Sequence, residues 1–500
     1  MAWINKLYFG DCFTITREHL RTASVDLIYL DPPFNSQRQY NSIYKDETGR
    51  PLPDQIDAFC DMWELDPETE RSIRMAPVMM RDHGLDDATV QLWTQWMRAL
   101  RQTNPRLLAY LAYMSLRLLD FHRILKPTGS LYLHCDPTAS HYIKALLDAI
   151  FGHANFRNEI VWCYTGPSNT RRWFPRKHDT VFFYAKSADA TFNRDAVRIP
   201  YSAETLARRG RIEGEQSIIS PSAETQDRRG ADAVEQRFGQ GKVPEDWWND
   251  IPVLTNQRER MGYATQKPLA LLERIIKASS NEGDVVLDPF CGCATTLEAA
   301  ERLGRRWVGI DIAIHAIRRV ASVRLSERFG LVEGTDYTIQ GVPGTLEGAQ
   351  LLHEQDPYQF QRWAVAEVEG FVTSKQTADG GIDGRLYFAL PNEPDLQSMV
   401  LEVKGGQHVR ITDLRALRAV LDDDLALMAG LIIMEPRSPH QTRNFEKYMA
   451  QAGVLEVLGI EYPRMQILTV PEILKGQRFN TPTVAGVHIP QPVLPGLPRG

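Results

Sequence analysis

Short apolar runs alternate with stretches of helical spacing from the start of the chain to about residue 330. Residues 25–30 (VDLIYL) form an apolar run interrupted only by Asp26, which is typical of a strand buried on both faces of a parallel sheet. Apolar residues recur at helical spacing over 106–125 and again over 268–279. This alternation predicts an α/β fold built on a doubly wound sheet.

The other elements of this region continue the pattern. We expect strands at 6–9, 131–134, 159–164, 180–184, 285–287 and 307–310, and helices at 13–20, at 142–151 and up to residue 302. The tetrapeptide Lys126-Pro127-Thr128-Gly129 indicates a turn before one of these strands. The pattern loosens between about 165 and 260, so we interpret that segment as an insertion within one domain of residues 1–332.

A second, shorter alternation begins at residue 358. It predicts a helix at 359–369, strands at 385–390 and 398–404, and a helix at 411–421, which together suggest a small α/β domain at 358–475. Residues 333–357 are interpreted as a linker with some local structure. The last segment, 476–500, contains five prolines and is expected to be extended or disordered.

Composition places the chain among ordinary globular proteins, with 43% hydrophobic and 24% charged residues. No run of 18 apolar residues occurs, and the first residues lack the pattern of a signal peptide, so we expect a cytoplasmic protein without a membrane partner. The six cysteines are scattered and form no C-x-x-C pair. This spacing argues against a disulfide framework and against a thiolate zinc site.

Charge is distributed unevenly. The whole chain carries a net charge of −6, which argues against a uniformly basic surface for nucleic acid. Residues 45–71 are acidic, which is usual for a solvated surface. Residues 171–211, by contrast, hold ten cations and four carboxylates. Taken alone, such a basic run is more often a solvated loop than a binding site.

The buried run at 25–30 ends abruptly in Asp31-Pro32-Pro33-Phe34. The prolines cannot continue a hydrogen-bonded ladder, and they fix the backbone. We therefore expect a carboxylate and an aromatic ring to be held at the carboxyl end of a buried strand.

A second apolar run, 285–287, leads into Asp288-Pro289-Phe290-Cys291-Gly292-Cys293-Ala294-Thr295-Thr296. The next strand ends at Asp311, 23 residues after Asp288. In Rossmann-type sheets a small-residue turn approaches the ligand, and an acid about 20 residues further on binds ribose hydroxyls. The G-x-G-x-x-G fingerprint is absent, which argues against NAD. A buried strand that ends by chance in Asp-Pro is the alternative.

The two motifs together resemble those of amino-group DNA methyltransferases, which transfer a methyl group from S-adenosylmethionine to adenine N6 or cytosine N4. In that family the first motif is Asn, Asp or Ser followed by two prolines and an aromatic residue. The order here, with the catalytic motif before the basic segment and the cofactor motif last, looks like the β class. The resemblance covers roughly residues 1–330 and implies a Rossmann-like sheet with circularly permuted motifs.

The resemblance implies catalytic roles for Asp31, Pro32, Pro33 and Phe34. The Asp31 carboxylate and the Pro32 carbonyl are expected to accept both N–H bonds of the target amine, and the Phe34 ring to stack on a base flipped out of the duplex. Asp rather than Ser at position 31 makes adenine the preferred base. Cytosine N4 is the alternative.

For the cofactor, the resemblance implies S-adenosylmethionine at the second motif. Thr265-Gln266-Lys267-Pro268 matches a further cofactor-side motif of the family, and Gly10-Asp11 resembles the loop that reaches the cofactor's adenine. Cys293 stands where the family has its second glycine, with Ala294 beside it. The candidate cofactor residues are Asp11, Thr265, Lys267, Pro268, Asp288, Pro289, Phe290, Gly292, Thr295 and Asp311.

Between these motifs the basic segment takes on a different meaning. It becomes a candidate target-recognition region at about 165–260, with double-stranded DNA as the partner, because arginines neutralise phosphates and pair with guanine edges. The candidate DNA-binding residues are Arg171, Arg172, Arg176, Lys177, Arg208, Arg209 and Arg211.

The small C-terminal domain carries a second candidate chemistry. Glu402 and Lys404 lie two residues apart on a predicted strand, so their side chains share a face. With Asp383, they resemble the active site of the PD-(D/E)xK nuclease fold, particularly its Mrr-like branch. The resemblance covers about 358–470 and implies that Asp383 and Glu402 hold Mg²⁺ while Lys404 orients the attacking water. A chance ion pair on an exposed strand is the alternative.

The leading hypothesis is a site-specific DNA adenine-N6 methyltransferase fused to a restriction-like nuclease, in a restriction-modification or DNA-defence setting. The alternatives are a cytosine-N4 methyltransferase and a DNA-binding defence subunit whose nuclease-like domain does not cut. The partners considered beside DNA are a second copy of the chain and a further defence-system subunit.

Overall fold

The computed structural model describes residues 3–33, 63, 65–166, 170–201, 241–254, 259, 266–314, 316–372, 382–391, 393, 396–406, 409–422, 426–435 and 439–482. It also gives the backbone of four short strands, β3 (Gln39–Ser42), β4 (Ile56–Cys60), β8 (Gly210–Glu213) and β9 (Gln216–Ile219). These strands form two hairpins, β3 with β4 and β8 with β9.

The larger sheet has nine strands among the described residues, in the order β10-β6-β7-β5-β2-β11-β12-β1-β13. Their bounds are β1 (Asn5–Phe9), β2 (Val25–Leu30), β5 (Leu125–Cys135), β6 (Phe156–Cys163), β7 (His178–Ala185), β10 (Trp247–Trp248), β11 (Val285–Asp288), β12 (Arg306–Asp311) and β13 (Tyr337–Gln340). Neighbouring strands are parallel except around β7, which runs antiparallel to both β5 and β6. The sheet is therefore mixed, with a parallel centre.

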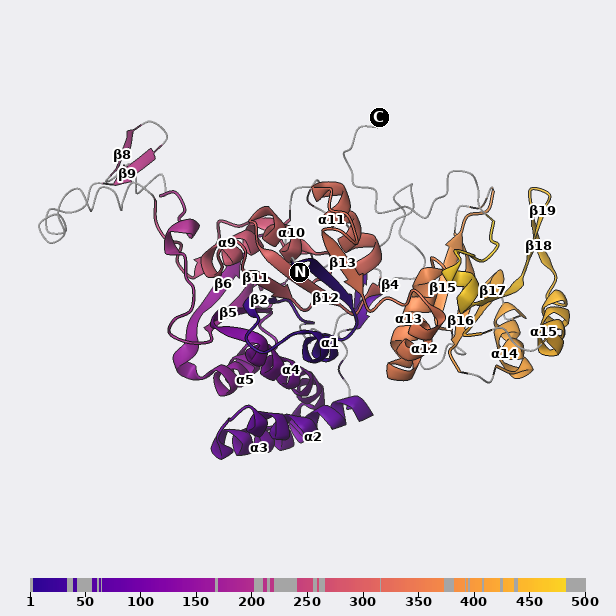
Figure 1. Ribbon diagram of the computed structural model, residues 1–500, viewed down its shortest axis with the longest axis horizontal. Helices are drawn as coiled ribbons and strands as arrows, with labels where there is room; N and C mark the ends of the chain where they lie inside the picture. Colours follow the sequence, from indigo (N-terminus) through magenta and orange to yellow (C-terminus); the bar gives the residue numbers. More distant parts are fainter. Residues whose placement is uncertain are drawn as a thin grey trace, which may run out of the picture.

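Helices cover both faces of this sheet (Figure 1). One face packs on α1 (Cys12–His19), α4 (Pro105–Ile124) and α5 (Ser140–Phe151), and the other on α9 (Leu269–Ser279), α10 (Thr295–Arg302) and the π-helical turn Ala316–Ala321 that leads into α11 (Ser322–Phe329). Alternate residues of β2 follow this division: Ile28 and Leu30 pack on the first face, and Leu27 and Tyr29 on the second. The predicted doubly wound arrangement is present.

A helical hairpin, α2 (Pro67–Asp82) and α3 (Asp87–Thr103), packs outside α4. The side chain of Asp66 accepts a hydrogen bond from Thr69 N at 2.7 Å and so caps α2, and Glu70 pairs with Arg101 of α3 at 2.6 Å. Part of the acidic segment that we interpreted as a solvated surface therefore begins a helix. Carboxylates are favoured there because they complement the positive end of the helix dipole.

The strand expected at 131–134 is longer than predicted, because β5 begins at Leu125 and includes the proposed turn. Its pairing with β2 shifts register between Val25 and Leu27, opposite Leu125 and Ser130. The residues 126–129 bulge out of the ladder at that shift, so Pro127 and Gly129 interrupt pairing without ending the strand.

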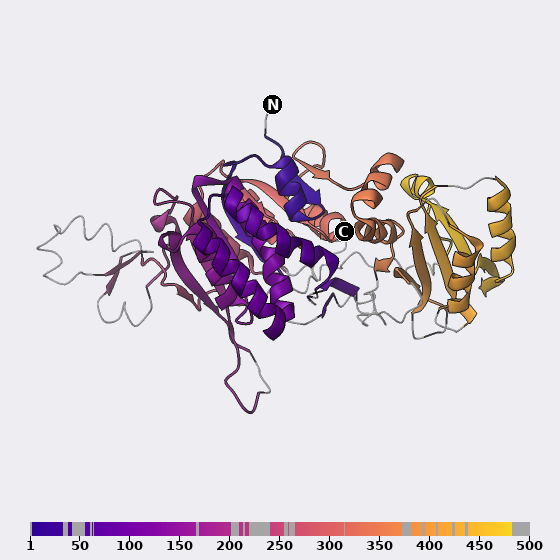
Figure 2. The same ribbon diagram turned by 90° about the horizontal axis from the view of Figure 1, so that it is seen from below.

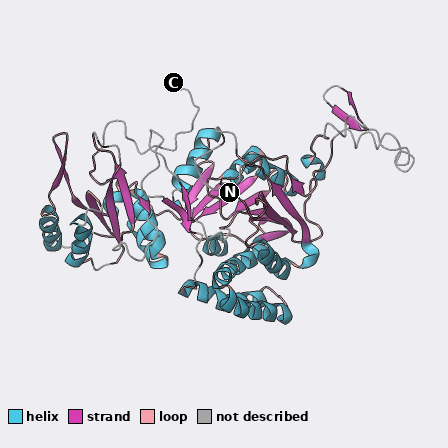
Figure 3. Cartoon of the chain, turned by 180° about the vertical axis from the view of Figure 1, so that it is seen from behind, coloured by secondary structure: helices cyan, strands magenta, loops and turns pink. Residues whose placement is uncertain are grey.

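The C-terminal region has its own sheet, drawn in magenta apart from the larger one in Figure 3. Its five strands lie in the order β14-β15-β16-β17-β20. The strands are β14 (Phe371–Val372), β15 (Gly384–Phe388), β16 (Gln397–Lys404), β17 (Met428–Ile433) and β20 (Met465–Thr469). The first three are antiparallel, and the last three parallel. Between parallel strands run α14 (Ile411–Asp422) and α15 (Pro439–Ala450), followed by the hairpin β18 (Val454–Val457) and β19 (Ile460–Pro463); α16 (Val470–Leu474) follows β20.

The segment 333–357 differs from the predicted linker. Its strand β13 pairs with β1 and extends the larger sheet to Gln340, and its helix α12 (Leu346–Gln355) packs on α13 (Pro357–Glu367) of the C-terminal region. Arg318 and Glu367 approach to 3.5 Å across the junction. The connection is thus built mainly of regular structure that belongs to one sheet or the other (Figure 1). Within the described part of the chain, no helix has the length and apolarity needed to cross a bilayer.

Candidate active site

Four neighbouring parallel strands of the larger sheet, β2, β11, β12 and β1, end in aspartates. Asp31 directly follows β2, Asp288 and Asp311 are the last residues of β11 and β12, and Asp11 lies two residues beyond β1. Since the strands are parallel, their carboxyl ends share one edge of the sheet, where α/β folds bind ligands. The two sequence motifs, 257 residues apart from Asp31 to Asp288, therefore meet.

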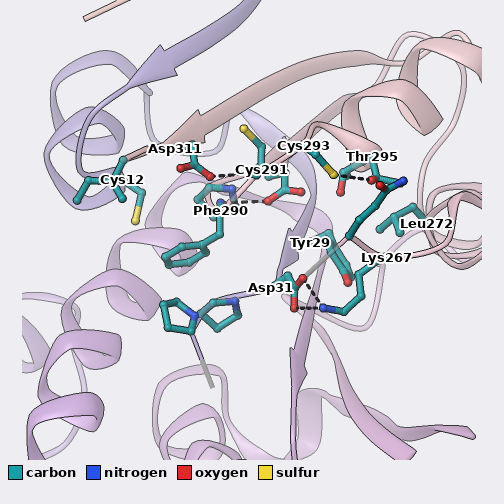
Figure 4. Close-up of a pocket in the computed structure, with 18 of the residues that line it drawn as sticks. Cys12, Tyr29, Asp31, Lys267, Leu272, Phe290, Cys291, Cys293, Thr295 and Asp311 are labelled. Carbon is teal, nitrogen blue, oxygen red and sulfur yellow. Dashed lines mark hydrogen bonds and ion pairs between the residues drawn. The ribbon is translucent and has the colours of Figure 1, made fainter. Parts of the chain in front are cut away.

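A pocket lies at this edge (Figure 4) and holds about 970 Å³ of space, counting the part that opens to solvent. It is lined by predicted residues from both motifs, Asp31, Pro32, Pro33, Asp288, Pro289, Phe290, Gly292, Thr295 and Asp311, together with Asp11 and Lys267. Phe34 and Thr265 lie outside the described residues.

At the catalytic end of the pocket, Asp31 is paired with Lys267. The Lys267 Nζ lies 2.8 and 2.6 Å from the two carboxylate oxygens of Asp31, and both side chains are largely buried. Lys267 stands two residues before α9, next to Pro268, which caps that helix. The sequence motif placed Lys267 on the cofactor side, but its ammonium contacts Asp31, the carboxylate predicted to be catalytic.

At the other end, the carboxyl of Asp288 is buried and Asp311 is half-buried. Asp311 accepts hydrogen bonds from Gly292 N and Ala313 N, both at 2.7 Å, and Asp288 accepts one from Phe290 N at 3.0 Å. Burial nevertheless raises the pKa of Asp288 to about 7 and that of Asp311 to about 6. Buried acids with raised pKa values are stabilised in their charged form by a cationic or hydroxyl-bearing ligand.

Asp11 is positioned by two elements. One carboxylate oxygen caps α1 by accepting from Phe13 N at 3.0 Å and Thr14 N at 3.2 Å, and the other pairs with the buried Arg117 of α4. The Arg117 guanidinium lies 3.2 Å from the ring centre of Tyr113, which also lines the pocket. Sequence reasoning missed Arg117, because a cation within an apolar helix gives no indication of which carboxylate it meets.

The turn between β11 and α10 contains the position at which this chain lacks a glycine expected from the resemblance. Gly292 has φ 48°, and Ala294 has φ 61° and ψ 30°, which is left-handed backbone. The sequence comparison placed the missing glycine at Cys293; the residue in the glycine-favouring conformation is Ala294. An L-residue there costs roughly 1–2 kcal/mol.

A buried hydrogen-bond chain that sequence reasoning also missed runs away from the pocket. Tyr29 of β2 lines the pocket, and its hydroxyl lies 3.0 Å from His134 Nδ1 on β5. The other ring nitrogen, Nε2, lies 3.1 Å from Asp179 on β7, and Tyr164 donates to that carboxylate at 3.1 Å. Each residue lies on or beside a successive strand, so only the sheet order brings them together.

The predicted DNA-binding cations are only partly described. Arg171, Arg172 and Arg176 are exposed on the connection between β6 and β7, and Lys177 there is half-buried. Arg208, Arg209 and the side chain of Arg211 lie outside the described residues.

In the C-terminal sheet the three predicted residues come together. Asp383 precedes β15 and accepts a hydrogen bond from Val403 N of β16 at 2.7 Å. On β16 itself, Lys404 Nζ lies 2.6 Å from Glu402 Oε1. Burial raises the pKa of Glu402, as do the nearby carboxylates of Asp383 and Asp413, while Lys404 opposes the rise. Asp413 on α14 was not predicted.

Metal ligation is not evident from the side chains alone. Within the described ranges, no group of three or more His, Cys, Asp or Glu residues is arranged to hold a metal ion.

The family model N6_N4_Mtase, described as DNA methylase, matches residues 25–322. The chain belongs to this DNA methylase family. The match begins at β2 and ends at the start of α11, so it contains both motifs and most of the pocket lining, and Asp11 lies before it. The amino-methyltransferase class expected from the two motifs is confirmed.

Two curated methylases illustrate the relationship. The Type II methyltransferase M.HpaI of Haemophilus parainfluenzae is 29% identical over 270 residues, which cover 54% of this chain and 74% of that protein. The DNA adenine methyltransferase YhdJ of Escherichia coli (strain K12) is 31% identical over 195 residues, which cover 39% and 59% respectively. Among solved structures, the cytosine-N4-specific PvuII DNA methyltransferase is 14% identical with a TM-score of 0.34, covering 66% of this chain and 88% of that one.

Proposed function

We propose that this methylase transfers a methyl group from S-adenosylmethionine to adenine N6 of a base flipped out of double-stranded DNA. The observation that carries the proposal is the meeting of Asp31 with Asp288 and Asp311 in one pocket. An aspartate at position 31 and the name of the relative YhdJ, an adenine methyltransferase, favour adenine over cytosine.

The cofactor end of the pocket fits S-adenosylmethionine by its charge. The cofactor carries a positive sulfonium and an ammonium group, and Asp288 and Asp311 are acids whose pKa burial raises. We assign Asp288, Pro289, Phe290, Gly292 and Thr295 to its binding, with Asp311 at ribose hydroxyls. When bound, the cofactor supplies an already activated methyl group, so the protein's task is to position the acceptor nitrogen.

The catalytic end fits an exocyclic amine. The Asp31 carboxylate and the Pro32 carbonyl accept the two N–H bonds, which turns the nitrogen lone pair toward the cofactor end. A carboxylate has about four lone-pair sites, so Asp31 can bind the amine while it keeps Lys267. Lys267 therefore acts as a positioning residue that neutralises Asp31 and fixes its orientation, which is a different role from the cofactor contact suggested by its motif.

The test uses purified protein, radiolabelled S-adenosylmethionine and plasmid DNA. We expect the wild-type protein to label DNA and Asp31→Ala to abolish labelling. The matched control is Asp136→Ala: Asp136 follows the neighbouring strand β5 but is not among the residues that line the pocket. Labelling that survives in Asp31→Ala would overturn the assignment.

The identity of the methylated base decides between adenine and its alternative. Mass spectrometry of nucleosides from the labelled DNA is expected to find N6-methyladenine. N4-methylcytosine in its place would support the cytosine-N4 hypothesis, and methylation-sensitive sequencing of the same DNA would give the recognition site.

We further propose that the C-terminal region is a restriction-endonuclease-like domain that cuts DNA with Mg²⁺. The observation that favours it is the convergence of Asp383, Glu402 and Lys404 at one end of β16. Asp383 and Glu402 would hold the ion, with water and phosphate completing its oxygen ligands, and the ion would stabilise charge at the phosphate. Lys404 would orient the attacking water.

This second activity is tested by cleavage of methylated and unmethylated plasmids with Mg²⁺. We expect cutting that Lys404→Ala removes and that the exposed Lys475→Ala leaves intact. Absence of cutting on both plasmids would support the alternative of a non-cutting DNA-binding domain. Such a pair of activities would place the chain in restriction-modification or DNA defence.

A further inference from the structure

Two adjacent aromatic side chains stand exposed on the connection between β6 and β7. Phe174 is 93% exposed, the most of any large hydrophobic residue described, and Trp173 is 67% exposed. Isolated exposed hydrophobics are common on protein surfaces. Two neighbouring aromatic rings that are both exposed are less common, and their exposure indicates a binding partner that buries them.

The direction of the strands places this connection at the catalytic edge of the sheet. The carboxyl end of β5 shares that edge with β2, since the two strands are parallel. Because β7 is antiparallel to β5, its amino end pairs with the carboxyl end of β5, with Thr180 opposite Cys135. The connection between β6 and β7 therefore leaves the sheet on the side of Asp31, and Figure 2 shows it projecting from the body of the molecule.

The positive charge around the two rings favours a polyanion as the binding partner. From Arg171 to Lys177 the sequence RRWFPRK has four cations and no carboxylate. Residues 171 to 176 are all exposed. Arginine side chains beside exposed aromatics combine phosphate contacts with stacking surfaces, which is the chemistry of nucleic-acid binding.

The base of the connection is anchored to the catalytic strand. Tyr164 N donates to Lys177 O at 3.0 Å and closes the loop, and the Tyr164 hydroxyl donates to Asp179. From there His134 continues to Tyr29, two residues before Asp31. The loop thus has a fixed position relative to the catalytic carboxylate, although its tip is open.

We propose that Trp173 and Phe174 form an aromatic wedge that enters the DNA duplex beside the target base and fills the gap left when that base is flipped out. The inference rests on the proposed methyl transfer to DNA and names the residues that open the duplex. Apolar side chains inserted between base steps unstack and kink DNA in other proteins. Base–aromatic stacking of this kind compensates for part of the stacking lost on flipping.

The test compares a paired target base with one that is already easy to extrude. The protein is the full chain carrying Trp173→Ala and Phe174→Ala, and the DNA is a duplex with the mapped methylation site. On the fully paired duplex, we expect kcat/KM to fall about 5- to 150-fold, the equivalent of one stacking contact. On the same duplex with the target base opposite an abasic site, flipping costs less, and we expect most of the loss to be restored.

Control variants separate the wedge from other roles. Leu92→Ala removes a large side chain of similar exposure on α3 and should behave as wild type on both duplexes. Phe174→Trp keeps a ring at the tip and should retain activity. A 2-aminopurine at the target position should brighten on binding of the wild-type protein and much less with the double variant.

Each other outcome has a distinct meaning. An equal loss on the paired and abasic duplexes would overturn the wedge and leave only a surface contact to DNA. Unchanged activity of the double variant would also overturn it and would favour a protein partner for the two rings. A wild-type protein that labels no DNA would instead overturn the proposed methyl transfer on which the wedge depends.

Discussion

Two of the lysine–carboxylate pairs in this chain, one in each sheet region, have the same 2.6 Å contact but arise in different ways. Lys404 and Glu402 are two residues apart on one strand, and their side chains are 39% and 9% exposed. Lys267 and Asp31 are 236 residues apart and come from different elements, with side chains only 11% and 15% exposed. The first pair follows from the pleat of any strand, whereas the second exists only once the larger sheet has assembled.

The difference shows where removal of one charge should lower the stability of the protein most. An exposed pair is screened by water and contributes little to stability, usually below 1 kcal/mol. A buried pair contributes little as a pair, but removal of one partner leaves an uncompensated charge, which costs about 3–5 kcal/mol. The methylase pocket is therefore the region in which single charge changes should have the larger effects.

The largest effect is expected from Lys267→Met, which removes the cation and keeps the length of the side chain. The Asp31 carboxylate is then buried without its partner, and we expect the free energy of unfolding to fall by about 3–5 kcal/mol at pH 8. Urea unfolding followed by tryptophan fluorescence at this pH measures the loss.

Lys404→Met provides the matched control for this comparison, since it breaks a pair of equal length. Its effect should be smaller than that of Lys267→Met, because Lys404 is 39% exposed and water screens the pair from that side, although Glu402 itself is only 9% exposed. Equal losses for the two variants would contradict the distinction between the pairs.

The next effect concerns the two acids at the cofactor end. Burial raises the pKa of Asp288 to about 7, so below pH 7 its carboxyl is largely protonated and must lose a proton to bind a cation. Calorimetric affinity for S-adenosylmethionine should therefore weaken about 30-fold, or about 2 kcal/mol, from pH 8 to pH 5.5. Binding should release protons, which titrations in buffers of different ionisation enthalpy detect.

The same shifts affect stability with the opposite dependence on pH. An acid whose pKa is raised by folding stabilises the protein below its ordinary pKa near 3.8, and this contribution is lost as the pH rises through about 6 for Asp311 and about 7 for Asp288. Asp288→Asn should flatten this dependence and that of cofactor affinity together. A flat affinity between pH 5.5 and 8 in the wild-type protein would show that neither acid meets the cofactor's charge.

Sequence reasoning could predict the parts of the fold that depend on local pattern. The apolar run at 25–30 is β2 with the predicted bounds, and the aspartates that follow the apolar strands are at one edge because parallel strands share their carboxyl ends. Burial is less regular than the pattern suggests for Trp247 and Trp248 of β10, since only Trp248 is buried. Their strand is short and lies at the edge of the sheet, where one face can remain open.

The rest could not be predicted, because it depends on contacts between distant segments. The partner of Lys267 is a case in point: the motif around it indicates the right pocket but not the end of the pocket that it reaches. The same holds for Arg117 and for the chain from Tyr29 to Asp179, whose members are neighbours only through the order of β2, β5 and β7. No spacing within the sequence encodes that order.

The smallest expected effect tests whether the turn that lines the methylase pocket holds a strained backbone. Ala294 stands in left-handed backbone at the start of α10, where glycine is not strained. We expect Ala294→Gly to raise the free energy of unfolding by up to about 1 kcal/mol, since the relief of strain exceeds the entropy gained by the unfolded chain.

Ala299→Gly, the same change inside α10, provides the control. It should lower the free energy of unfolding by about 1 kcal/mol or more, because helix propensity and a buried methyl are lost. Thermal unfolding of the two variants and of the wild-type protein shows whether each change stabilises or destabilises the fold. Destabilisation by both would mean that the Ala294 methyl is needed for packing in the turn and that its left-handed backbone carries no residual strain.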